Sequence, residues 1–271
     1  MRFVLTRPAP EGEASALRLR QAGLDVVALP LIGITEPDRE QAETLRRCWR
    51  SLHEHRAVMF VSAAAVQHFF GAAAPGSRWP AATRAWAPGP GTAAALSAQG
   101  VPADAIDTPA QDAAQFDSEA LWATAGGRIA RGDSVLIVRG AEADRADDAG
   151  SGHGRAWMAE QLAGAGAVVS AVAAYRRGKP AWSDAESAQA MSLAGPGTAW
   201  VFSNSEAIAH LFALLPVAAE ALRQGTALAT HPRIAASANA AGFARVVMAR
   251  PGVVGLEQAM TALDRSIEST E

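Results

Sequence analysis

The sequence predicts an α/β protein that folds as two lobes. Short apolar segments alternate with longer, alanine-rich amphipathic segments, a pattern typical of parallel strands joined by crossover helices. At 271 residues the chain exceeds the usual size of one hydrophobic core, which favours two domains. Similar segments also recur at an offset of 142 residues, as expected for two copies of one folding unit.

Strands are expected at the apolar segments that end in a turn. Glycines mark the ends of several preceding helices, as in LRLRQAGLDVV and LSAQGV, because glycine readily adopts the positive φ that ends a helix. The expected strands are RFVLT (2–6), AVMFVS (57–62), RAWA (84–87), SVLIV (134–138), VVSAVAAY (168–175), TAWVFS (198–203), ALAT (227–230) and ARVVMA (244–249).

The repeat is clearest around two strand and helix pairs. MFVSAAAVQHFF aligns with VFSNSEAIAHLF, which pairs Phe60 with Phe202 and His68 with His210. The strand that ends in arginine begins near residue 4 in one copy and near residue 135 in the other. The two copies are therefore not arranged simply head to tail.

This arrangement predicts a chain that crosses twice between its lobes. We expect one lobe from residues 1–34 plus 178–271 and the other from residues 38–172, with linkers at 35–37 and 173–177. Two linkers limit twisting but allow a hinge to open, which suits a cleft between the lobes.

Composition excludes several classes of function. The net charge of −3 argues against a broad nucleic-acid surface, which needs an excess of lysine and arginine. The single cysteine, Cys48, rules out an internal disulfide and a cysteine zinc site. The apolar start of MRFVLTRP is too short for a signal peptide and no apolar segment is long enough for a membrane span, so a cytoplasmic location is expected. We also expect a monomer.

Metal and nucleotide motifs are weak. His53 and His55 lie two residues apart, so they point to opposite sides of a helix, and no third ligand is evident. GPGT at 89–92 lacks the lysine of a phosphate loop and the third glycine of a dinucleotide motif. Neither motif predicts a metal or nucleotide site.

Candidate ligand contacts lie where strands lead into helices. Ligands of parallel sheets bind at the carboxyl ends of the strands, where the free N–H groups of helix N-termini favour anions. Ser62 and Asn204 occupy equivalent repeat positions, although helix capping alone could explain both. The loops of this kind are Thr6-Arg7-Pro8, Val61-Ser62-Ala63, Gly89-Pro90-Gly91-Thr92, Ser203-Asn204-Ser205 and Thr230-His231-Pro232-Arg233.

The only tyrosine of the chain, Tyr175, ends an apolar segment and precedes Arg176 and Arg177. No serine, histidine and aspartate triad and no carboxylate pair stands out elsewhere. An enzyme with so few catalytic groups would perform chemistry that is intrinsically easy and depends on the shape of the site.

The order of these motifs resembles the uroporphyrinogen-III synthase family. The resemblance rests on VLTRP, FVSAAAV, GPGTAAAL, VLIVRG, GAVVSAVAAYRR, VFSNSEAI and HPRIAASANAAGF, and extends from about residue 3 to residue 250. It implies two flavodoxin-like lobes with parallel sheets, a two-stranded linker, and a cleft between the lobes.

The resemblance also implies an activity. Enzymes of this family are lyases of tetrapyrrole (haem) biosynthesis that cyclise the linear polycarboxylate hydroxymethylbilane, and they invert its last pyrrole ring through a spiro intermediate. They need no metal or organic cofactor. The enzyme that forms the bilane is a candidate partner.

The resemblance assigns roles to individual residues. Tyr175 falls on the family's tyrosine, which would donate a hydrogen bond to the departing hydroxyl; the alternative is a linker residue that packs its ring and exposes its hydroxyl. Arg233 stands where the family commonly has a threonine. The residues expected to bind substrate are Arg7, Ser62, Ala63, Gly91, Thr92, Arg139, Arg176, Ser203, Asn204, Ser205 and Arg233.

Two other functions fit a bilobal α/β chain. One is a non-catalytic, regulatory module that closes on a small anion, because the same lobes and hinge would serve sensing. The other is a nucleotide-sugar transferase, which lacks support because no nucleotide-binding signature is present.

Overall fold

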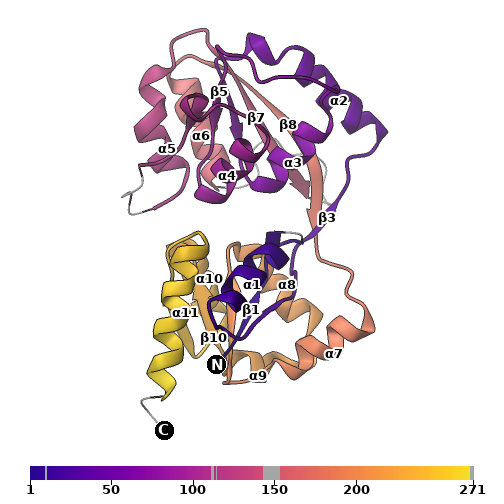
Figure 1. Ribbon diagram of the computed structural model, residues 1–271, viewed down its shortest axis with the longest axis vertical. Coiled ribbons are helices and arrows are strands. Elements are labelled where there is room, and N and C mark those ends of the chain that lie inside the picture. Colours follow the sequence, from indigo (N-terminus) through magenta and orange to yellow (C-terminus); the bar gives the residue numbers. More distant parts are fainter. Residues whose placement is uncertain (10, 111–112, 114, 143–152, 269–271) are drawn as a thin grey trace. The chain divides into compact units, whose positions relative to one another are not determined.

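The computed structural model describes residues 1–9, 11–110, 113, 115–142 and 153–268. The chain divides into two compact units, each with its own sheet (Figure 1). Unit 1 comprises Met1–Ile34 and Gly178–Glu271, and unit 2 comprises Thr35–Arg177. The α/β class with two mostly parallel sheets is as predicted.

Unit 1 contains a five-stranded sheet with the order β11-β10-β9-β1-β2, in which every neighbouring pair is parallel. Register places Leu5 beside Val201, and Val201 beside Leu228. The strands are β1 (Arg2–Leu5), β2 (Val26–Ala28), β9 (Thr198–Phe202), β10 (Thr226–Ala229) and β11 (Arg245–Met248).

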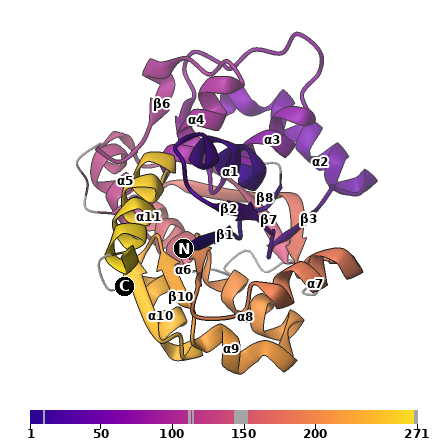
Figure 2. The same cartoon turned by 60° about the horizontal axis from the view of Figure 1, so that its bottom comes forward.

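Helices cover both faces of this sheet (Figure 2). Alternation along the strands directs Trp200 and Phe202 to one face and Val201 to the other, and all three are fully buried. The first face packs on α8 and α10, the second on α1 and α11. The helices are α1 (Glu11–Gln21), α7 (Asp184–Ser192), α8 (Ser205–Leu214), α9 (Ala219–Arg223), α10 (Pro232–Ala241) and α11 (Val253–Glu268).

Unit 2 contains a six-stranded sheet with the order β3-β8-β7-β4-β5-β6. The pairs from β8 to β6 are parallel. The two crossings of the chain, within β3 and at the end of β8, are neighbours in this sheet. The strands are β3 (Gly33–Thr35), β4 (Ala57–Phe60), β5 (Arg84–Trp86), β6 (Ile106–Asp107), β7 (Ser134–Glu142) and β8 (Val168–Gly178).

The helices of unit 2 are α2 (Arg39–Arg50), α3 (Ala63–Gly71), α4 (Pro90–Ala98), α5 (Ser118–Ala125) and α6 (His153–Gly164). Helices α5 and α6 pack together over one face of the sheet, and α3 packs against α4. An aromatic cluster joins α2 to α3, where Trp49 stacks on Phe69 with ring centroids 5.2 Å apart. The Trp49 indole also donates a hydrogen bond to the Phe69 carbonyl.

The two sheets share one strand order, but the chain enters them at different points. From β2, sheet 1 has the flavodoxin-like order 2-1-3-4-5, and sheet 2 has the same order from β8 if β7 is counted first. In unit 2, however, β4, β5 and β6 precede β7 and β8 in the chain. The second copy is thus a circular permutation of the first, which explains why the sequence repeats are not head to tail.

Equivalent helix ends carry equivalent glycines. Gly100 follows α4 with φ 81°, and its repeat partner Gly242 caps α10 with φ 91°. Both adopt the left-handed conformation that favours glycine. Gly100 and Gly242 lie 142 residues apart, so this part of the sequence repeat reflects a shared way of ending a helix.

Some segments differ from the expectation. The glycine-containing segment AGSGHGRA (149–156) has the composition of a loop, but α6 begins within it, at His153. Its first four residues, and the charged segment EADRADD (142–148) beyond Glu142, lie outside the described residues. Strands β2, β3 and β6 are not among the expected strands, because two or three residues are too few to form an apolar pattern.

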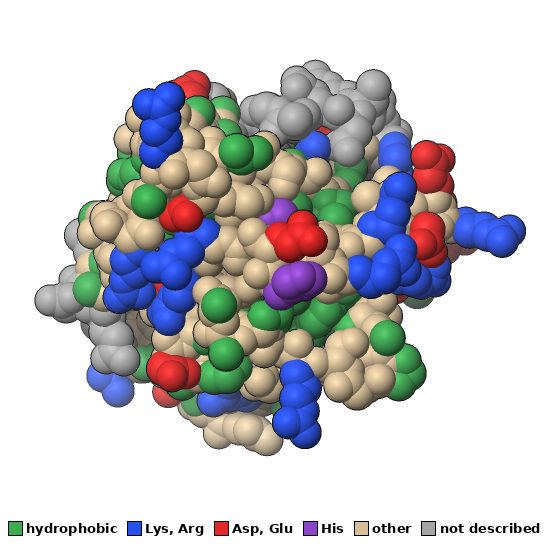
Figure 3. Space-filling view, turned by 90° about the horizontal axis from the view of Figure 1, so that it is seen from above, with side chains coloured by type: hydrophobic (Ala, Val, Ile, Leu, Met, Phe, Trp, Pro, Cys, Tyr) green, Lys and Arg blue, Asp and Glu red, His purple; other side chains and the backbone are tan. Residues whose placement is uncertain are grey.

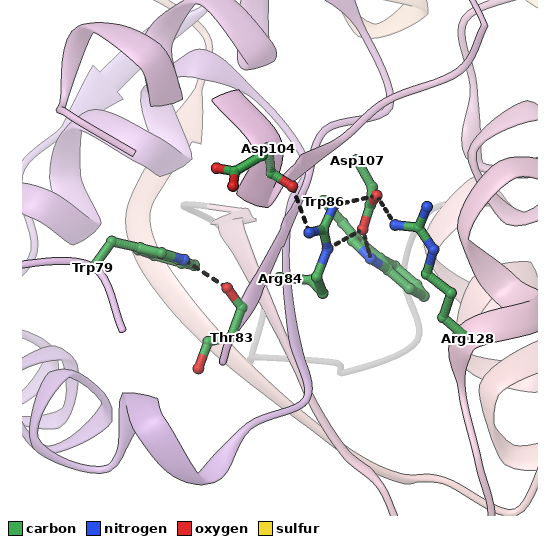
Figure 4. Close-up of polar contacts among 7 residues, drawn as sticks. All are labelled: Trp79, Thr83, Arg84, Trp86, Asp104, Asp107 and Arg128. Carbon is green, nitrogen blue, oxygen red and sulfur yellow. Dashed lines mark hydrogen bonds and ion pairs between the residues drawn. The ribbon is translucent and has the colours of Figure 1, made fainter. Parts of the chain in front are cut away.

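A buried carboxylate joins β5, β6 and the segment before β7 (Figure 4). Asp107, 5% exposed, accepts hydrogen bonds from Arg84 Nε at 2.8 Å, Trp86 Nε1 at 3.1 Å and Arg128 Nη1 at 2.5 Å. The carboxylate raises the pKa of Arg84. These contacts give a buried charge the partners that it requires.

The surface in Figure 3 carries basic side chains in separate groups, with acidic side chains between them. On α2, Glu43 lies 3.0 Å from Arg46 and 3.1 Å from Arg50. Within the described part of the chain, no single helix has the length and apolar composition of a membrane span, and the one pair that has them together, Ser205–Leu214 with Pro216–Arg223, is bent by 96°.

Candidate active site

The site is centred on Tyr175, which an irregularity in β8 directs at the neighbouring strand. Arg139 on β7 pairs with Ala173, but the next residue, Gly140, pairs with Tyr175. Ala174 is therefore an extra residue, a β-bulge of the kind that re-aims side chains next to functional sites. The bulge places the ring of Tyr175 on Gly140.

The Tyr175 side chain is enclosed by residues of unit 2. It is 4% exposed, and its hydroxyl lies 3.0 Å from Ser62 Oγ. The ring stacks on the imidazole of His68, with centroids 5.4 Å apart and planes inclined by 29°. The structure thus supports neither the exposed hydroxyl of a linker residue nor a freely accessible phenol.

Ser62 links Tyr175 to the N-terminus of α3. As the N-cap, Ser62 Oγ accepts a hydrogen bond from the Ala65 N–H at 3.1 Å. The two hydroxyls of Ser62 and Tyr175 share two protons, and their mutual bond uses one. The other remains available to an acceptor, and Ser62 is the more exposed of the pair.

Two helix N-termini lie at the carboxyl ends of the neighbouring strands β4 and β5. Ala63 begins α3, and Gly91 and Thr92 lie in the first turn of α4, whose N-cap is Gly89. The first N–H groups of a helix have no partner within it and attract anions. The Thr92 side chain is buried and its N–H donates to the Gly89 carbonyl at 3.1 Å, while Pro90 has no N–H, so this turn offers the Gly91 N–H as a donor.

The predicted arginines of unit 2 differ in their surroundings. Arg139 is 4% exposed, and its Nη1 donates to the Gly140 carbonyl at 3.3 Å. Arg176 Nη2 donates to the Glu142 carbonyl at 3.4 Å. Both side chains therefore flank the strand pair that carries Tyr175.

The predicted residues of unit 1 form a second group. Arg7 donates from Nε to Ser203 Oγ at 2.9 Å and forms an ion pair with Glu11 at 2.9 Å. Asn204 caps α8 by accepting a hydrogen bond from the Glu206 N–H at 2.8 Å. Arg7 and Asn204 thus lie at adjacent strand ends.

The remaining predicted residues of unit 1 lie in first turns of helices. Ser205 is the first residue of α8, and Arg233 is exposed in the first turn of α10. His231 caps α10, because its Nδ1 accepts a hydrogen bond from the Arg233 N–H at 3.1 Å.

Among the described residues, no group of three histidine, cysteine, aspartate or glutamate side chains could hold a metal ion. His55 binds Ser134 Oγ through Nδ1 at 2.8 Å, and burial lowers its pKa, an effect that Glu54 partly opposes. His53 is exposed beside Glu54. Burial raises the pKa of the Cys48 thiol, which makes it a poor nucleophile at neutral pH.

The family model for uroporphyrinogen-III synthase HemD matches residues 13–256. The chain belongs to the uroporphyrinogen-III synthase HemD family. This is a family of lyases, and the match includes all the residues described around Tyr175. A comparison with curated proteins gave no match.

Solved structures of family enzymes share the fold. A selenomethionine mutant of uroporphyrinogen III synthase from the extremely thermophilic bacterium Thermus thermophilus matches with a TM-score of 0.54 and 16% identity over 99% of each chain. Uroporphyrinogen-III synthetase from Helicobacter pylori matches with a TM-score of 0.52 and 17% identity, over 98% of this chain and 100% of that one.

Three residues around the tyrosine of this HemD family member were not predicted from the sequence. They are Gly140, against the ring; His68, stacked on it; and Glu36, whose Oε2 lies 3.2 Å from His68 Nδ1. The repeat alignment marks His68 through its partner His210, and Gly140 directly follows the conspicuous VLIVR segment. Glu36 leaves no sequence signal, because one carboxylate after a short strand is unremarkable.

Proposed function

We propose that this protein is a uroporphyrinogen-III synthase, which cyclises hydroxymethylbilane with inversion of the last pyrrole ring. The observation that carries the proposal is the hydroxyl pair of Ser62 and Tyr175 in a chain of the HemD family. Ser62 stands at the start of α3, where the helix dipole favours negative charge.

The first step is loss of the terminal hydroxyl of the substrate. The lone pair of the pyrrole nitrogen expels the hydroxyl with the electron pair of the C–O bond and leaves a cationic, N-protonated azafulvene. Tyr175 gives its proton to Ser62, and the Ser62 proton passes to the departing oxygen, which leaves as water.

Ring closure needs mainly geometry. The substituted carbon of the last pyrrole attacks the electrophilic azafulvene carbon to form the spiro intermediate, whose opening and reclosure invert that ring. The proton released when the final ring regains aromaticity returns through Ser62 to Tyr175, so one water is the net loss. Holding the reacting carbons together favours this closure over direct cyclisation.

The carboxylates of the substrate have suitable partners. In unit 2 these are the N–H groups of Ala63 and Gly91 and the guanidinium of Arg176, and in unit 1 they are the N–H of Ser205 at the start of α8 and the guanidinium of Arg233. Backbone N–H groups bind anions without a strongly basic protein, consistent with the net charge of −3.

The test is the isomer formed from enzymically generated hydroxymethylbilane. We expect uroporphyrinogen III in the presence of the protein, without added metal or cofactor, and the symmetric isomer I in a protein-free blank. A mixture dominated by isomer I would refute the proposal. Binding of the substrate without any change in its products would favour the anion-binding module instead.

A further inference from the structure

The imidazole of His68 contacts two other side chains of unit 2, those of Tyr175 and Glu36. One face stacks on the ring of Tyr175, with centroids 5.4 Å apart. Its Nδ1 lies 3.2 Å from Glu36 Oε2. The His68 side chain is only 14% exposed, whereas that of Glu36 is 83% exposed. Glu36 therefore approaches the ring from the solvent side and fixes an otherwise buried side chain.

These contacts join the two crossings of the chain. Glu36 directly follows β3, the first crossing, and Tyr175 lies near the end of β8, the second. His68 belongs to α3, the same helix that Ser62 caps. One helix thus contacts the phenol twice, at its hydroxyl through Ser62 and at its ring face through His68.

We propose that His68 is a positioning residue that holds the Tyr175 phenol in line with Ser62, with Glu36 orienting the imidazole. The inference rests on the proposed function for its effect on turnover. Gly140 closes off the strand side of the ring and His68 lies against a face of it, so His68 limits how the ring can tilt. A tilted ring would lengthen the 3.0 Å contact between the two hydroxyls.

The other copy of the repeat has a histidine at the equivalent position, and its contacts do not involve a tyrosine. His210, the equivalent residue on α8 of unit 1, places Nδ1 2.7 Å from the Leu31 carbonyl and Nε2 3.7 Å from Glu206. Each histidine thus fixes its helix to residues near the first crossing. Stacking on a phenol is the additional feature of His68, and His210 is a matched control.

The experiment uses the fact that Tyr175 is the only tyrosine of the chain. Protein labelled with ¹³C at the tyrosine ζ carbon gives a single NMR signal from the phenol, whatever the activity. We expect His68→Leu to shift this signal and to lower kcat about tenfold, with KM changed less than about twofold, because the lost contact orients a catalytic group. His68→Phe, which retains an aromatic ring, should restore part of both.

Glu36→Ala provides a second test that does not endanger folding, because the side chain is exposed. It should shift the phenol signal in the same direction as His68→Leu and lower kcat about threefold, with a smaller effect because the stack itself remains. His210→Leu should leave the phenol signal unchanged, and His53→Leu should leave both signal and turnover unchanged.

An unshifted phenol signal in both His68→Leu and Glu36→Ala would overturn the inference, whatever happens to turnover. A shifted signal with wild-type kcat would also overturn it, because the orientation would then be irrelevant to the reaction. If the wild-type protein formed no isomer III, the proposed function would fail, while the labelled phenol would still report whether His68 positions it.

Discussion

The ring of Tyr175 lies so close to Gly140 that no side chain fits between them. A Cβ built on Gly140 would lie 2.6 Å from both Cε2 and Cζ of Tyr175 and 2.9 Å from its hydroxyl oxygen. Contacts this short force a neighbour to move. Gly140 is therefore required for steric reasons, since its φ is not among the positive values of the described glycines.

Gly140→Ala should displace the phenol and break its hydrogen bond to Ser62. We expect kcat to fall by about tenfold or more and the free energy of unfolding to fall by about 1–3 kcal/mol, as for an overpacked core. Steady-state kinetics and urea unfolding measure the two effects. Gly127→Ala is the control, because no atom lies within 4 Å of its added Cβ.

Tyr175→Phe removes the hydroxyl but keeps the ring that packs on Gly140 and His68. If Tyr175 supplies the proton for departure of the hydroxyl, kcat should fall by about a hundredfold, with a smaller change in KM. Rates of isomer III formation measure the loss. An unchanged kcat would remove the proton-donor role and leave the family assignment untouched.

Ser62 combines two roles that substitution can separate. Ser62→Asn introduces the residue type that caps the equivalent helix α8, where Asn204 accepts a hydrogen bond from the Glu206 N–H. This substitution should preserve stability but lower kcat. Ser62→Ala should lower kcat and also cost about 1 kcal/mol of stability. Equal kcat values for Ser62→Asn and the wild type would exclude a proton relay through the serine.

Asp107 should be a major determinant of the stability of unit 2. Asp107→Asn leaves Arg84 and Arg128 without their buried charge partner, so the free energy of unfolding should fall by about 3 kcal/mol. Urea unfolding gives the value. Asp104→Asn is a suitable comparison, because Arg84 binds the backbone carbonyl of Asp104 and not its carboxylate, and it should change stability little.

His55 should make stability depend on pH below its ordinary pKa of about 6.5. Burial lowers the pKa of His55 in the folded protein, so between the two pKa values the unfolded chain holds a proton that the folded chain does not. The contribution of His55 is present above about pH 6.5 and is lost as the pH falls through its folded pKa.

Urea unfolding at pH 7.5 and pH 5.5 checks this effect. The loss of stability on acidification should be smaller in His55→Asn than in the wild type. His53→Asn should leave the loss unchanged, since His53 is exposed. Identical pH dependence in all three proteins would show that His55 titrates alike in both states.

The α/β class and the two sheets are predictable because they depend on regular patterns. Segments such as TAWVFS alternate between two buried faces, and the strand β9 (Thr198–Phe202) follows the pattern closely. Ser62 and Asn204 are also predictable as caps, because serine and asparagine commonly supply the first turn with an acceptor.

The surroundings of Tyr175 are not predictable in this way. The bulge at Ala174 lies in a run of small apolar residues. A shift in how this run pairs with β7 would leave the apolar sequence pattern unchanged, so the pattern does not predict the register. Without that register, the contact between Gly140 and the Tyr175 ring cannot be predicted. The contact between Glu36 and His68 joins the residue after β3 to a residue of α3, and it depends on tertiary packing and not on sequence spacing.

The permuted order of the second sheet has a consequence for synthesis on the ribosome. The first 34 residues carry β1 and β2, but β9, on which β1 pairs, is translated only after the whole of unit 2. All strands of unit 2 are consequently synthesised before the sheet of unit 1 is complete. Strand β1 of the nascent chain cannot pair with β9 until more than half of the polypeptide has followed it from the ribosome.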